Sequence, residues 1–169
     1  MYRRSPPGWR DGSLGIRESG GVTSRFVLYH VVWDGRWTTH IPRNPTTSAP
    51  VLVRGSGRAR VEEAVSVWRR ANAGGTSRAV FSAFCNALRE NPHPETGGAP
   101  QLVGIISKAG TPGFAAGVIF GGRPYFQGLA AAEFTGRAAV PWFNELFERC
   151  DHQTLARSRQ ASTHVRPGN

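Results

Sequence analysis

Residues 53–68 read VRGSGRARVEEAVSVW, a stretch in which the local signals change twice. It begins with β-branched residues, breaks at a Gly-Ser-Gly turn, and continues with apolar residues at helical spacing. Arg58 and Arg60 stand where the expected helix begins, although the helix dipole disfavours positive charge there. The stretch therefore predicts a short strand, a turn and a helix with an unusually basic start.

The same basic character extends over the whole chain. Its 169 residues include 21 Lys and Arg against 11 Asp and Glu, which gives a net charge of +10. Such an excess favours a polyanionic partner, with nucleic acid ahead of an anionic membrane surface. No apolar run approaches the roughly 20 residues that span a bilayer, and the N-terminus lacks the apolar segment of a secretory signal. We therefore expect no membrane partner, and an intracellular location is favoured over secretion.

Hydrophobic patterns on both sides of this stretch predict the secondary structure. Strands are expected at 25–33, 36–41 and 50–54, with a hairpin turn at Asp34-Gly35. Helices are expected at 61–71, from Thr76 or Ser77 as N-cap to about 89, and at 140–150. Further strands are expected at 101–107, 114–120 and 123–128. The order βββα then αβββα predicts an α+β protein of two small units, each a three-stranded antiparallel sheet with a helix on one face.

Composition sets the expected boundaries of these units. Residues 1–23 are rich in Gly, Ser, Pro and Arg and are expected to form a flexible basic arm, and 151–169 a flexible tail. The two units then cover 24–75 and 76–150. Strand alternation does not decide whether the side chains of Trp33 and Tyr125 lie in the core or on the surface. Core positions are expected for Trp37, Trp68, Phe84, Phe114, Phe143 and Phe147.

The second unit resembles a double-stranded-RNA-binding domain. Its loop KAGTPG (108–113) and the stretch GFAAGVIFGGRPYFQG (113–128) have that family's short glycine/proline loop, aromatic-led strand and glycine-ended strand. The first unit has the family's G-x-G turn and basic helix start, at residues 55–60. The resemblance thus covers about 24–150, as one partial and one complete copy. The second copy departs from the pattern, since it offers only Gly136-Arg137 where the family places lysines.

The resemblance implies binding to double-stranded RNA. A-form RNA is recognised by shape, through phosphates and 2′-hydroxyls, and a helix start with arginines would point at the phosphates. This would explain Arg58 and Arg60, for which plain solvation at an exposed helix start is the alternative. The residues that the resemblance places at the RNA are Arg54, Ser56, Arg58, Arg60, Ser77, Arg78, Lys108, Thr111 and Arg137.

Two other functions remain open from the sequence. A βββα unit also resembles the AP2 type of DNA-binding module, in which strand arginines, here Arg36 and Arg123, would enter the major groove of DNA. The chain could instead be a structural or protein-interaction subunit of a larger complex. In that case the second unit, poor in basic residues, would form a homodimer or bind a protein partner.

Catalytic chemistry is not indicated. The five histidines show no metal-ligand spacing, although His30 and His40 are expected to face each other across the hairpin. Cys85 and Cys150 are expected to be buried free thiols on amphipathic helices. The Gly-Ser-Gly turn is too short for a phosphate-binding P-loop. We therefore expect a protein that is not an enzyme, with no cofactor and no metal.

Overall fold

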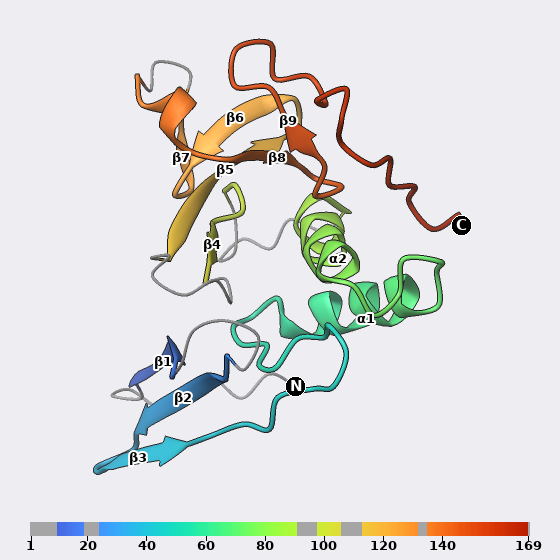
Figure 1. The fold of residues 1–169 in the computed structure, drawn as a ribbon. Helices are drawn as coiled ribbons and strands as arrows, with labels where there is room; N and C mark the ends of the chain where they lie inside the picture. Colours follow the sequence, from blue (N-terminus) through green and yellow to red (C-terminus); the bar gives the residue numbers. More distant parts are fainter. Residues whose placement is uncertain (1–9, 19–23, 91–97, 106–112, 132–134, 169) are drawn as a thin grey trace. The chain divides into compact units, whose positions relative to one another are not determined.

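The computed structural model describes residues 10–18, 24–90, 98–105, 113–131 and 135–168 (Figure 1). It confirms the α+β class, with two α-helices and two sheets in these ranges. Two compact units divide the chain: Met1–Thr46 with Ile105–Pro112, and Thr47–Gly104 with Gly113–Asn169. The division differs from the expected boundaries, because the helix at 58–69 belongs to the second unit rather than to the sheet that precedes it.

The first unit is a three-stranded antiparallel sheet in the order β1-β2-β3. The hairpin of β2 (Phe26–Trp33) and β3 (Trp37–His40) confirms two predicted strands, and Gly35 takes the positive φ of 103° that its turn needs. The predicted cross-strand pair is also present, since His30 lies opposite His40 with ring centroids 6.4 Å apart.

The third strand of this sheet differs from the predicted one. β1 (Arg10–Arg17) lies inside the segment expected as a flexible arm and pairs along its whole length with β2. Residues 50–54, expected as a strand, form none, and Pro50 lacks the N–H that a ladder needs. The two glycines in 10–17 gave this segment the composition of a loop. Its pairing with β2, which is distant in sequence, nevertheless stabilises it as a strand.

The second unit begins with two helices that pack together. α1 (Arg58–Arg69) and α2 (Ser77–Glu90) confirm the two predicted helices. Trp68, only 1% exposed, packs from α1 against Ala79 and Ala83 of α2. The side chain of Thr76 caps α2, because its Oγ1 accepts the N–H of Ala79 at 3.2 Å.

A mixed sheet completes the second unit, with β5 (Phe114–Phe120) at its centre. Phe81 and Cys85 of α2 pack on Val118 of β5, while Ile119 belongs to a separate cluster with Trp142. Val118 and Ile119 are consecutive in β5, so their side chains point to opposite faces of the sheet and pack in different clusters. β5 pairs antiparallel with β4 (Leu102–Gly104) and with β6 (Arg123–Phe126). It pairs parallel with β8 (Trp142–Asn144). The outer strands are β7 (Leu129–Ala130), which pairs with β6, and β9 (Arg149–Cys150), which pairs with β8.

The helix predicted at 140–150 is wrong, because this segment forms β8, a turn and β9. The Asn144 side chain holds the turn: its Oδ1 accepts the N–H groups of Leu146 and Glu148, both at 3.0 Å. Phe147 takes a positive φ of 57°, which no α-helix contains. The second copy therefore lacks the second helix that the resemblance implies.

The C-terminal residues 151–168 are held to the second unit rather than forming a loose tail. His164 is 7% exposed, and its backbone N–H donates to Glu148 Oε1 at 2.8 Å. Ser158 N–H donates to the carbonyl of Arg149 at 2.8 Å. Polar residues gave this segment the composition of a tail, but the buried Glu148 carboxylate needs donors, and the returning chain supplies one.

Both thiols are free and buried, as predicted. Burial raises the pKa of Cys85 and of Cys150 above that of an ordinary thiol. Cys85 lies on α2 as expected, whereas Cys150 lies on β9 rather than on a helix.

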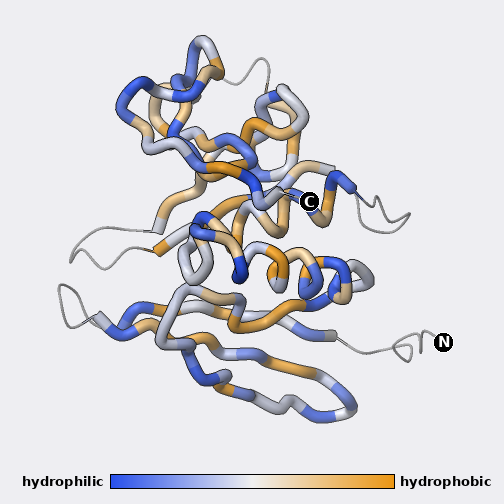
Figure 2. The backbone as a smooth tube through the Cα atoms, turned by 90° about the vertical axis from the view of Figure 1, so that its right-hand side faces the viewer, coloured by the Kyte–Doolittle hydropathy of each residue, from blue (hydrophilic) through white to orange (hydrophobic). Residues whose placement is uncertain are grey.

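Along the backbone, Figure 2 shows hydrophobic and hydrophilic residues alternating within both units. Among the described residues, no helix combines the length and the apolar character that a bilayer crossing requires.

Candidate nucleic-acid interface

A groove of about 740 Å³ runs along α1 in the second unit. One wall is residues 49–54, which the sequence predicted in part as a strand. The other wall is a single face of α1, because Arg58, Glu62, Ser66 and Arg69 recur at the spacing of helical turns. The adjacent face of the helix buries Trp68, which lies about 100° around the helix from Arg69, so packing fixes which side chains the helix presents to the groove.

The groove has an excess of positive charge. Four guanidinium groups line it, from Arg54, Arg58, Arg69 and Arg70, and Glu62 is the one carboxylate among the described residues that line it. Arg58 Nε donates to Glu62 Oε1 at 2.7 Å, an exposed pair across one helical turn. Because water screens such a pair, it leaves the groove open to a competing anion.

The turn before α1 brings the backbone to the end of this groove. Gly55 takes a positive φ of 96°, and its carbonyl accepts the N–H of Arg58 at 3.2 Å. Gly57 occupies the N-cap position without a side-chain hydrogen bond, and no acidic residue stands in the first turn. The positive end of the helix dipole is therefore not neutralised by a carboxylate in its own first turn.

The structure brings together only part of the predicted site. Arg54 and Arg58 line the groove, and Ser56 lies half-buried in the turn between them. Arg60 is on the same helix but is not among the lining residues, because two residues along an α-helix turn the side chain by about 200°. The sequence treated Arg58 and Arg60 as one pair, and the helical geometry separates them.

The remaining predicted residues come from the second copy of the resemblance. Ser77 and Arg78 begin α2, where Ser77 Oγ lies 3.4 Å from Ser48 Oγ. Arg137 lies in a short 3₁₀-helix, Arg137–Ala139. Lys108 and Thr111 lie outside the described residues. None of these five is among the described residues that line the groove.

Two arginines of the groove were not predicted from the sequence. Arg69 and Arg70 end α1, three helical turns after Arg58. Arg70 Nη1 donates to Ser66 Oγ at 3.2 Å, which orients its side chain along the helix. Counting helical turns forward from Arg58 would have identified Arg69, since the two positions lie eleven residues apart on one face.

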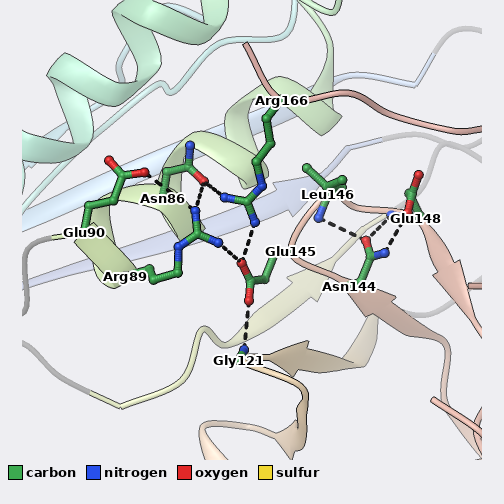
Figure 3. Close-up of polar contacts among 9 residues, drawn as sticks. All are labelled: Asn86, Arg89, Glu90, Gly121, Asn144, Glu145, Leu146, Glu148 and Arg166. Atoms are coloured by element: carbon green, nitrogen blue, oxygen red, sulfur yellow. Dashed lines mark hydrogen bonds and ion pairs between the residues drawn. The ribbon is translucent and has the colours of Figure 1, made fainter. Parts of the chain in front are cut away.

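A second groove, of about 720 Å³, lies between the end of α1 and residues 163–168. Its arginines are Arg70, which it shares with the first groove, and Arg166. The Arg166 guanidinium donates to Glu145 Oε2 and to Asn86 Oδ1, both at 2.7 Å (Figure 3). Because Glu145 neutralises Arg166, this groove offers less positive charge than the first.

The alternative sites are placed differently. Arg36, in the turn before β3, and Arg123, on β6, are both exposed and belong to different units. Within the described ranges, no three His, Cys, Asp or Glu side chains are placed to hold a metal ion. Comparison of this chain with family models, curated proteins and solved structures finds no match.

Proposed function

We propose that this chain is a non-catalytic nucleic-acid-binding protein that binds double-stranded RNA through the groove along α1. The observation that supports the proposal is the ratio of four guanidinium groups to one carboxylate on the walls of that groove. Arg58 and Arg69 lie eleven residues apart, or roughly 17 Å along the helix axis. That distance matches several consecutive phosphates of one strand.

The lining of the groove favours a duplex over a single strand. Among the described residues that line it there is no aromatic side chain, so the groove offers no surface on which unpaired bases could stack. Besides the Glu62 carboxylate, its polar side chains carry guanidinium groups and a serine hydroxyl, which suit phosphate oxygens and 2′-hydroxyls. Phosphate and sugar contacts of this kind read the shape of an A-form helix rather than its base sequence.

The test is the salt dependence of binding to a blunt RNA duplex. For the double variant Arg58→Ala, Arg69→Ala, we expect the slope of log affinity against log salt concentration to fall by about 1.5 to 2. Affinity at low salt should fall at least tenfold, because two phosphate contacts and their released counterions are lost. Fluorescence anisotropy with a labelled duplex, at several salt concentrations, measures both quantities.

A matched control removes the same charge elsewhere. The double variant Arg36→Ala, Arg123→Ala also lacks two exposed arginines, but neither residue lines the groove. We expect it to retain the groove-dependent part of the salt slope. If both double variants weaken RNA binding equally, only net charge matters and the assignment of the groove is wrong. Selective loss of duplex DNA binding in the control would favour the strand-arginine alternative.

A further inference from the structure

One face of the sheet in the first unit is apolar and aromatic. Directly paired residues of antiparallel strands share a face, and successive residues alternate between faces. Tyr29 lies opposite Leu14, and Trp33 opposite Trp37. The described side chains on this face, which we call the aromatic face, are Leu14, Ile16, Val27, Tyr29, Val31, Trp33, Trp37 and Thr39.

The aromatic face carries the two most exposed large apolar side chains of this sheet. Trp37 is 63% exposed and Leu14 60%, and Thr39 is exposed as well. Four side chains of the face are half-buried, and Val27 is buried. On the opposite face, His30 and Val32 are buried. The expectation that Trp37 belongs to the core is therefore wrong. Strand alternation alone does not say which face of a sheet is covered.

Trp33 and Trp37 form the centre of this face. Their ring centroids lie 5.1 Å apart with the ring planes tilted by 53°, so each ring supports its neighbour. An exposed tryptophan held in place by a second ring loses little conformational freedom when a flat ligand stacks on it. This is the arrangement that nucleic-acid-binding sheets use for unpaired bases.

The charge of the first unit selects the kind of flat ligand. Its two segments, 1–46 and 105–112, contain eight basic and three acidic residues, a net charge of +5. Arg36, directly before Trp37, is exposed. A unit with a net positive charge and exposed aromatic rings complements a polyanion that carries aromatic bases, and this combination favours a nucleic-acid strand over an apolar protein surface.

We infer that the aromatic face binds single-stranded nucleic acid by stacking unpaired bases on Trp37 and its neighbours. This deepens the proposed function and rests on it for the class of ligand. The two surfaces contact different parts of a nucleic acid, since the groove along α1 binds phosphates of a duplex and the aromatic face binds bases that are not paired. The face reads aromatic surface rather than hydrogen-bonding edges, so its sequence preference is weak.

The experiment compares two single strands that differ only in their bases. One is an oligouridylate of about twelve nucleotides, within the range of site sizes for single-strand binders. The other has the same backbone with abasic residues, so it keeps every phosphate. We expect Trp37→Ala to weaken oligouridylate binding about tenfold and to leave binding of the abasic strand unchanged. Trp37→Phe should restore most of the lost affinity.

The control is Phe26→Ala, which removes an exposed aromatic ring from the opposite face of β2. It should leave binding of both strands unchanged. Equal losses on the two strands in Trp37→Ala, or no loss on either, would overturn the stacking role. The double variant Arg58→Ala, Arg69→Ala should keep the preference for oligouridylate over the abasic strand, so failure of the groove and failure of the aromatic face give different results.

Discussion

Burial separates the thiols of Cys85 and Cys150 from solvent. Burial raises the pKa of each thiol, and for Cys85 the nearby Glu145 carboxylate raises it further. Since the thiolate is the reactive form, neither residue is suited to nucleophilic chemistry in the folded protein. The raised pKa values also stabilise the fold below about pH 8.5, and this contribution falls as the pH rises above that value.

Alkylation tests the burial of the two thiols directly. In the folded protein at pH 8, we expect iodoacetamide to modify both cysteines slowly, because the reagent must wait for local or global opening of the fold. In denaturant, both cysteines should be alkylated at the rate of an unprotected thiol. Mass spectrometry of quenched samples gives the rate at each site. A thiol that reacts equally fast in the folded and unfolded states would contradict its buried position.

Glu145 shows how one carboxylate connects distant parts of the second unit. It accepts hydrogen bonds from Arg89 at 2.6 Å, from Arg166 at 2.7 Å and from the backbone N–H of Gly121 at 2.8 Å (Figure 3). Its side chain is only 14% exposed. Removal would therefore leave two guanidinium groups and one amide without their shared acceptor.

We expect Glu145→Ala to lower the free energy of unfolding by about 2 kcal/mol. Urea denaturation followed by circular dichroism measures the change. Glu90→Ala is the matched control, because Glu90 pairs with the same Arg89 at 3.6 Å but has a side chain that is 62% exposed. It should cost less than about 0.5 kcal/mol. Similar losses in the two variants would show that Glu145 is no more than a surface partner.

At the scale of elements, the pairing of β5 with β8 depends on a glycine. Gly117 lies opposite Trp142, and a Cβ at position 117 would overlap the indole ring. The ring cannot move aside easily, because Trp142 is 1% exposed and packs with Ile119. β8, which stands where a third helix was predicted, can therefore pack beside β5 because Gly117 has no side chain.

Gly117→Ala tests this packing. We expect it to lower the free energy of unfolding by about 3 kcal/mol, the upper range for an overpacked core. Gly12→Ala on β1 is the control, because a Cβ there meets no atom within 4 Å. That variant should change stability by less than about 0.5 kcal/mol. Chemical denaturation provides both values, and a tolerated alanine at 117 would show that β8 can shift away from β5.

The elements that the sequence predicted well are those whose pattern is complete within the element. The β-branched and aromatic run of β2, the apolar run of β5 and the helical stripes of α1 and α2 each contain their own signal. β1 contains two glycines and few apolar residues, so only its partner strand shows that it is a strand. Its prediction would require knowledge of pairing across the chain.

The segment at 140–150 failed for a different reason. Val140, Phe143, Leu146 and Phe147 fall at helical spacing, but spacing is a weak signal when turn chemistry opposes it. Asn144 caps a tight turn through its side chain, and the parallel pairing of β8 with β5 adds a ladder that no local window contains. Pro141 and Asn144 were the local signals against a helix.

The candidate site was predictable to a similar degree. Arg54 and Arg58 were identified from the turn and the helix start, and both line the groove. Arg69 lies on the same helical face but at the far end of α1, so a motif confined to the helix start contains no signal for it. The exposure of Trp37 could not be derived, since an aromatic residue in a strand is compatible with either face of the sheet.

At the scale of the whole molecule, positive charge is divided equally between the two units. The first unit has eight basic and three acidic residues, and the second has thirteen and eight, so each carries a net charge of +5. Each unit therefore attracts a polyanion independently, and the two units are covalently linked in one chain. When two sites on one chain bind one ligand, the second contact forms at a high effective concentration.

This arrangement predicts a preferred form of RNA, namely a duplex with a single-stranded extension. The groove along α1 would bind the paired part and the aromatic face the unpaired part, so we expect the combined ligand to bind at least tenfold more tightly than a blunt duplex. Competition against a labelled duplex, with extensions of increasing length, measures the gain. In Trp37→Ala the extension should confer little advantage, because the loss of stacking leaves only phosphate contacts for the unpaired strand. An extension that improves binding equally in both proteins would mean that added phosphates, rather than unpaired bases, account for the gain.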